Sequence, residues 1–296
     1  MFAGVPLGTH CVGAEIILHK TFLTEQSQSI NALNMQSKNI TYGSSSISYR
    51  SIGKGKPVVL LHGFGEDGEI WDQQVEYLKE HFHLIVPDLP GSGKSQMLSG
   101  DSEVGMEDYA EIVKVILDEE KIKECIMLGH SLGGYITLAF AEKYPSSLNA
   151  FGVVHSSAFA DSEEKKAARR KSIEFIKNNG AYEFLKTSIP GLFKGSDGSE
   201  PSDALVEKGR AFTPDALIQY YQAMIARPDR TEILKTFTGR ILFIIGEFDN
   251  AVPFQQSLQQ CYLPAVSDVH ILRNSAHMGM LEETGKVNEI IAAFLI

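Results

Sequence analysis

Residues 126–134 read Ile-Met-Leu-Gly-His-Ser-Leu-Gly-Gly, and their pattern is the strongest indication of the fold. An apolar run that stops at a serine between glycines, followed by small residues, predicts a strand, a sharp turn and a helix. Gly129 and Gly133 permit a backbone that larger side chains would obstruct. Ser131 would then project above the sheet edge as a nucleophile, with a helix N-terminus beneath it. Because Gly-x-Ser-x-Gly also occurs by chance, its context has to decide its meaning.

Strand-like and helix-like segments alternate on both sides of this turn. Residues 39–42 and 46–52 are rich in β-branched and aromatic residues and predict an opening hairpin. Further buried strands are predicted at 58–61, 84–86, 126–128, 151–154, 241–245 and 269–272. A helical stripe lies between two of them, at Tyr109, Ile112, Val113, Ile116 and Leu117. We therefore expect an α/β fold with a mostly parallel, doubly wound sheet of eight strands.

The alternation stops between residues 158 and 237, where only helical signals occur. Asp161 or Ser162 is a candidate N-cap, and Thr213-Pro214 opens a later helix. We expect a helical cap at 158–237, inserted into a core of residues 37–157 and 238–296. Residues 1–36 lack a clear period, so we expect them to be a disordered extension outside the fold.

The composition excludes several classes of partner and cofactor. The net charge of −10, from 27 basic and 37 acidic residues, argues against nucleic acid and against an anionic membrane surface. No apolar run is long enough to span a bilayer, so a cytoplasmic location is the default expectation. The cysteines are three, far apart and without metal-ligand spacing, so we expect neither a disulfide framework nor a metal site. Residues 91–95 resemble a phosphate loop but lack its first glycine, which is Asp88 here, so no nucleotide cofactor is expected.

Polar motifs follow four of the predicted strands. They are His62-Gly63-Phe64-Gly65, the turn around Ser131, Gly246-Glu247-Phe248-Asp249 and Asn274-Ser275-Ala276-His277. In an open α/β sheet the carboxyl ends of the strands gather at one edge, so these motifs should meet there. Ser131 is then the candidate nucleophile, His277 its base and Asp249 the acid that orients the base. Glu247 and Asp229 are alternative acids, and a structural role is the alternative for His277.

These motifs, together with Asp-Leu-Pro-Gly-Ser-Gly-Lys-Ser at 88–95 and Ser-Ala-His-Met at 275–278, resemble the α/β-hydrolase family, specifically its compact members with a helical cap. The resemblance covers roughly residues 39–296. It implies a serine hydrolase without a cofactor, acting on a small carboxylic ester or related acyl substrate through an acyl-enzyme. It also implies that the backbone N–H groups of Phe64 and Leu132 form the oxyanion hole.

The identity of the acyl substrate is not fixed by these motifs. Candidate pocket residues are His130, His155, Trp71 and Met278. A carbon–carbon bond hydrolase, a lactonase, an acyltransferase, a perhydrolase or a triad-retaining ligand receptor would use the same motifs. The basic residues Lys165, Lys166, Arg169, Arg170 and Lys171 indicate either a solvated helix face or a docking patch for an acidic acyl carrier.

Overall fold

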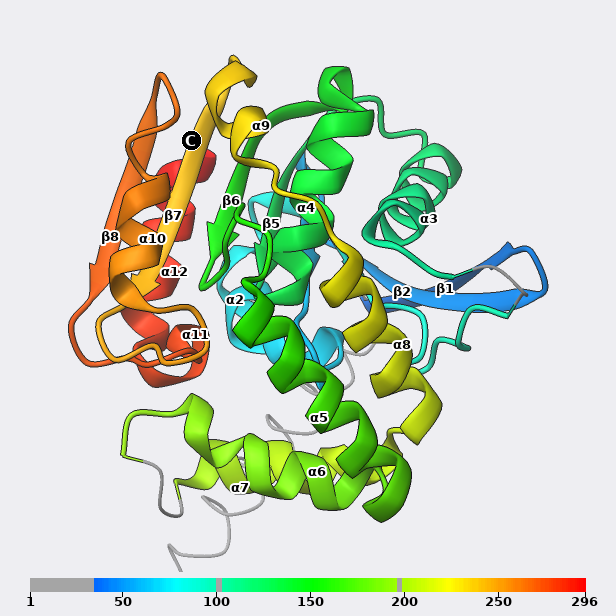
Figure 1. Cartoon of the computed structure of the whole chain (residues 1–296). Coiled ribbons are helices and arrows are strands. Elements are labelled where there is room, and N and C mark those ends of the chain that lie inside the picture. The colour runs from blue at the N-terminus through cyan, green and yellow to red at the C-terminus, as the bar shows by residue number, and fades with distance from the viewer. Residues whose placement is uncertain (1–34, 100–102, 196–198) are drawn as a thin grey trace, which may run out of the picture. The chain divides into compact units, whose positions relative to one another are not determined.

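The computed structural model describes residues 35–99, 103–195 and 199–296, and those from Ser37 onward form one unit (Figure 1). The expected disordered extension falls almost wholly on residues 1–34, outside these ranges. No helix within the described ranges combines the length and the apolar character needed to cross a membrane.

An eight-stranded sheet forms the centre of the fold, in the order β1-β2-β4-β3-β5-β6-β7-β8. Its strands are β1 (Met35–Tyr42), β2 (Ser45–Ile52), β3 (Lys56–Leu61), β4 (Phe82–Pro87), β5 (Cys125–His130), β6 (Leu148–Val154), β7 (Arg240–Gly246) and β8 (Ser267–Leu272). Strand β2 runs antiparallel to β4, and each neighbouring pair from β4 to β8 is parallel. The predicted sheet is confirmed. Strand β1 begins at Met35 and not at residue 39, and the sequence pattern missed this start because Gln36, Ser37 and Lys38 are polar and do not alternate.

Helices cover both faces of the sheet. Helices α3 (Met106–Glu119) and α4 (Leu132–Lys143) pack against each other on one face, and α2 (Asp72–Leu78) and α12 (Thr284–Leu295) do so on the other. The predicted stripe on α3 is buried in the core. Shorter elements complete this part of the chain: η1 (Gly68–Trp71), η2 (Pro145–Ser147), α10 (Phe254–Gln260) and α11 (Gly279–Glu282).

The chain between β6 and β7 is helical. It contains α5 (Glu163–Asn179), α6 (Ala181–Ser188), η3 (Pro190–Leu192), α7 (Glu200–Lys208), η4 (Gly209–Ala211), α8 (Pro214–Ala226) and α9 (Thr231–Thr236). The side chains of Ser162 and Thr213 cap α5 and α8, as the sequence predicts. Helices α5 to α8 lie beyond the carboxyl ends of the parallel strands, whereas α9 packs on α4 (Figure 1). We therefore propose residues 158–237 as a cap on the core formed by 37–157 and 238–296.

The connection from β5 to α4 requires glycine, because backbone segments approach each other closely there. A Cβ atom on Gly129 would lie 2.2 Å from the carbonyl oxygen of Gly133, and one on Gly133 would lie 2.5 Å from that of Leu61. Both obstacles are backbone atoms, so neither contact is relieved by rotating a side chain. The two glycines thus allow the helix to start directly against the sheet.

We predict that Gly129→Ala destabilises the protein by about 3 kcal/mol or prevents folding, because the added methyl group collides with backbone. Urea denaturation followed by circular dichroism measures the change in the free energy of unfolding. Gly285→Ala is the matched control, since Gly285 lies in α12 with open space around its Cβ position. That variant should be neutral or up to about 1 kcal/mol more stable. Equal unfolding midpoints for Gly129→Ala and the wild type would contradict the prediction.

Candidate active site

Ser131 occupies the turn between β5 and α4 in a backbone conformation that residues other than glycine rarely adopt. Its φ is 49° and its ψ is −112°. The backbone is held there from both sides, because the Ser131 N–H donates to the carbonyl of Val154 at 2.9 Å and the Ser156 hydroxyl donates to the Ser131 carbonyl at 2.6 Å. These bonds maintain the strained conformation, and the Ser131 side chain faces a cavity.

His277 and Asp249 are hydrogen-bonded through Nδ1 and Oδ2 at 2.8 Å. The other carboxylate oxygen of Asp249 accepts the backbone N–H groups of Ala251 and Val252, each at 2.9 Å. Burial would raise the pKa of Asp249, but His277 and His155 hold it far below its usual range. Asp249 is therefore an ionised, fixed acceptor that orients the His277 ring.

The two alternative acids, Glu247 and Asp229, interact with other groups. The Glu247 carboxylate is 3.3 Å from the Arg273 guanidinium, and Asp229 accepts the backbone N–H of Thr231 at 2.9 Å. Of these three carboxylates, Asp249 is the one that contacts His277 within the described residues. The geometry favours Asp249 as the candidate acid.

The two N–H groups that the resemblance implies as oxyanion donors occupy suitable backbone positions. Leu132 is the first residue of α4, where an N–H has no acceptor within the helix. Phe64 follows β3, and neither its N–H nor that of Leu132 donates to another backbone group in the described part of the chain. The Phe64 ring is stacked on Tyr221, with ring centroids 4.4 Å apart, which fixes the loop.

Glu66 and His130 form a buried pair beside His277 that the sequence did not reveal. Glu66 Oε2 is 3.0 Å from His130 Nδ1, and the other ring nitrogen of His130 is 3.0 Å from the carbonyl oxygen of His277. Both ring nitrogens thus face acceptors, which requires a protonated ring. Burial would lower the pKa of His130, but the Glu66 carboxylate raises it above the usual value. A charged His130 therefore anchors the backbone of His277.

His155 lies near the same Asp249 oxygen that His277 contacts. Its Nδ1 is 3.4 Å from Asp249 Oδ2, yet neither ring nitrogen makes a well-aligned hydrogen bond. Burial lowers the pKa of His155 to about 4, and the nearby Asp249 carboxylate only partly offsets this effect. The ligand atoms of His155, Asp249 and His277 lie within 4.8 Å of one another, as a metal site would require. Because Asp249 and His277 are already hydrogen-bonded, we assign these atoms to the catalytic candidate and not to a metal.

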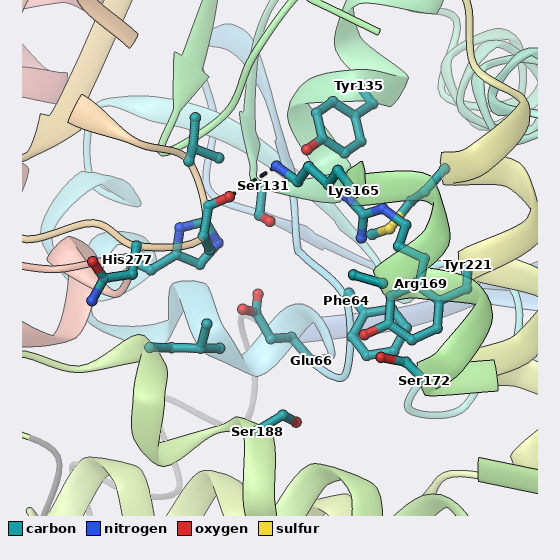
Figure 2. Close-up of a pocket in the computed structure, with 16 residues that line it drawn as sticks. Phe64, Glu66, Ser131, Tyr135, Lys165, Arg169, Ser172, Ser188, Tyr221 and His277 are labelled. Atoms are coloured by element: carbon teal, nitrogen blue, oxygen red, sulfur yellow. Dashed lines mark hydrogen bonds between the residues drawn. The ribbon is translucent and has the colours of Figure 1, made fainter. Parts of the chain in front are cut away.

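A cavity of about 310 Å³ lies over Ser131, between the sheet edge and helices α5 and α8 (Figure 2). Ser131, His277 and Glu66 face it from the core. Lys165, Arg169, Ser172 and Tyr221 face it from α5 and α8. The volume is that of a small-molecule site.

The four predicted pocket residues do not line this cavity. Trp71, His130, His155 and Met278 are each at most 1 % exposed. Trp71 packs in the core, and His130 is turned beneath the serine toward Glu66. Their contact with a substrate stays a prediction from their positions next to the motifs.

The basic cluster on α5 is divided between two environments. Lys165 and Arg169 line the cavity, whereas Lys166 pairs with Glu163 outside it and Arg170 and Lys171 are exposed. Two of the five basic residues therefore do not belong to a solvated face. Lys165 and Arg169 are four residues apart, so they lie on the same side of the helix.

Comparison with known proteins agrees with the fold. A sequence model described as the alpha/beta hydrolase fold matches residues 56–189. The pimeloyl-[acyl-carrier protein] methyl ester esterase of Vibrio parahaemolyticus is 37% identical over 257 residues, which are 81% of this chain and 94% of that protein. The chain belongs to the α/β-hydrolase family.

Other members of the family support this assignment. The corresponding methyl ester esterase of Vibrio vulnificus is 29% identical over 250 residues, covering 81% of this chain and 94% of that protein. A solved esterase from Thermogutta terrifontis has 28% identity and a TM-score of 0.81, with 88% of this chain and 98% of that chain covered. Since these relatives are esterases, the expectation of a hydrolytic enzyme is confirmed.

We predict that His155 makes this α/β-hydrolase lose stability as the pH falls from about 6.5 to about 4. An unfolded histidine titrates near 6.5, whereas burial holds the folded value at about 4. The unfolded chain therefore binds a proton in this range that the folded chain does not, which favours unfolding. Over this pH range the free energy of unfolding of His155→Gln should fall by on the order of 2–3 kcal/mol less than that of the wild type.

Urea denaturation at a series of pH values measures this slope. His81→Gln, at an exposed position, is the matched control and should follow the wild type. Parallel curves for His155→Gln and the wild type would show that His155 does not carry the effect.

Proposed function

We propose that the protein hydrolyses a small carboxylic ester through an acyl-enzyme on Ser131. The observation that carries this proposal is the hydrogen bond between Asp249 and His277, placed at the cavity that Ser131 also lines. The esterase relatives support the same reaction class.

In the first half-reaction His277 Nε2 accepts the proton of the Ser131 hydroxyl while Oγ bonds to the carbonyl carbon of the ester. The carbonyl oxygen becomes an oxyanion, which the N–H groups of Phe64 and Leu132 stabilise. When the carbon–oxygen bond to the alcohol breaks, His277 returns the proton to the departing alkoxide. The product alcohol leaves, and the acyl group stays on Ser131.

In the second half-reaction a water molecule takes the place of the serine hydroxyl. His277 accepts a proton from the water as its oxygen bonds to the acyl carbon, and Ser131 regains a proton as the acid leaves. Asp249 holds the proton of Nδ1 throughout, so Nε2 remains the free basic nitrogen. The carboxylate of Asp249 also stabilises the charged ring that forms in each half-reaction.

A carrier-linked substrate is the second candidate, because the Vibrio relatives are pimeloyl-[acyl-carrier protein] methyl ester esterases. Helix α5 supports it with the exposed basic residues Arg170 and Lys171, which an acidic carrier would contact. Reversing these two charges should then lower turnover of a carrier-linked methyl ester and not that of a free methyl ester. If the charge reversal changes the turnover of both esters by the same factor, or of neither, this candidate is removed.

We predict that Ser131→Ala lowers ester turnover by at least about four orders of magnitude, because the acyl group has no atom to bond to. The measurement is the release of acid from a panel of short acyl methyl esters, together with mass spectrometry after labelling with a fluorophosphonate. The label should add to Ser131 in the wild type and be absent from the folded variant.

Ser146→Ala is the matched control, since Ser146 is exposed in η2 and outside the cavity lining. It should keep full turnover and full labelling. Turnover retained in Ser131→Ala, or a label on another residue, would contradict the proposed mechanism. Lactones and vinylogous diketones in the same panel separate ester hydrolysis from lactonase and carbon–carbon bond hydrolase activity.

A further inference from the structure

Lys165 carries a positive charge on the cavity wall without a compensating carboxylate. Its side chain comes from α5, is partly buried and lines the cavity over Ser131 (Figure 2). The ammonium group donates one hydrogen bond, to the carbonyl oxygen of Ala251 at 2.9 Å. It forms no ion pair with any residue in the described ranges. An ammonium has three N–H donors, so donors and charge remain available to a ligand.

Arg169 lies one helical turn further along α5 and adds a second positive charge to the same wall. Its Nε donates to Asp161 Oδ2 at 2.6 Å, but Asp161 is shared with Arg227, whose Nη2 is 3.0 Å from Oδ1. One buried carboxylate therefore serves two guanidinium groups. Lys165, Arg169 and Arg227 carry three positive charges and Asp161 carries one negative charge, so these side chains have an excess of two positive charges.

The opposite wall of the cavity does not cancel this charge. The carboxylate of Glu66 is paired with the protonated ring of His130, so that pair is neutral. The buried Tyr135 ring, which also lines the cavity, reports the local excess: burial would raise its pKa, but Arg227, Lys165 and Arg169 lower it. This positive wall lies in a protein whose net charge is −10, so it is not a consequence of the overall composition.

We propose that Lys165 and Arg169 bind a carboxylate of the substrate, so that the preferred substrate is a small ester that also carries a free carboxylate. The inference rests on the proposed function and names the substrate class of that site. A substrate carboxylate would pair with Lys165 and receive N–H donors from Arg169. These contacts would orient the ester toward Ser131.

The test compares kcat/KM for pairs of esters that differ only in charge. On the acyl side, monomethyl glutarate is compared with the methyl ester of glutaramic acid. On the alcohol side, acetoxypropanoate is compared with its amide. We expect the wild type to prefer the anionic member of at least one pair by about tenfold or more. The pair that shows the preference tells which side of the ester carries the carboxylate.

Lys165→Met removes the charge and keeps the length of the side chain. It should reduce the preference for the anionic ester by about tenfold, mainly through KM, whereas Lys165→Arg should retain the preference. Lys166→Met, one residue along α5 and outside the cavity, is the matched control and should leave the preference unchanged. If Lys165 acted only structurally, through its bond to the Ala251 carbonyl, Lys165→Met would lower kcat/KM for the anionic and the neutral ester equally and leave their ratio unaltered.

The outcomes separate this inference from the proposed function. Equal kcat/KM for both members of both pairs, with Ser131 labelled and the neutral esters hydrolysed, would overturn the carboxylate site and leave the esterase intact. Failure to hydrolyse any ester, with no label on Ser131, would instead overturn the proposed function. An unchanged preference in Lys165→Met would also overturn the assignment of Lys165.

Discussion

The close contact between β5, the Ser131 turn and α4 fixes where the nucleophile lies relative to every other part of the site. Gly129 and Gly133 allow backbone atoms to approach within distances that any Cβ would block. The resulting turn holds Ser131 in a strained conformation above the sheet. Because the neighbouring strands are parallel, their carboxyl ends bring Phe64, Asp249 and His277 to the same edge. A change in this turn would move the serine relative to all of them.

Buried charges on both sides of His277 fix its position. Asp249 holds the ring through Nδ1, and the Glu66–His130 pair holds the backbone carbonyl. In both arrangements the buried carboxylate accepts more than one hydrogen bond, which is what makes a buried charge tolerable. His155 is the exception, because it lies near Asp249 without a well-aligned hydrogen bond and stays neutral at a lowered pKa. The site therefore combines one neutral and one protonated buried histidine around the candidate base.

The helices between β6 and β7 give the cavity its chemical character. The core supplies the same kind of serine, acid and histidine as in many enzymes of this family, and such a site is compatible with several substrates. Helix α5 adds Lys165 and Arg169, and α8 adds Tyr221, whose ring packs on Phe64. Substrate choice is thus inferred to depend on the helical segment, while bond breaking depends on the strand ends.

The eight-stranded sheet, the turn at Ser131 and the chain order of Ser131, Asp249 and His277 could all be predicted from the amino-acid sequence. These features are local, since apolar runs, glycines and polar residues at strand ends follow from spacing along the chain. The tertiary structure decided what depends on contacts between distant segments. Glu66 meets His130, and Asp249 rather than Glu247 meets His277. Trp71 and Met278 turn into the core, and the α5 cluster divides between cavity and solvent. Periodicity places a residue on a helix or strand, but the partner that faces it is set only when the layers pack.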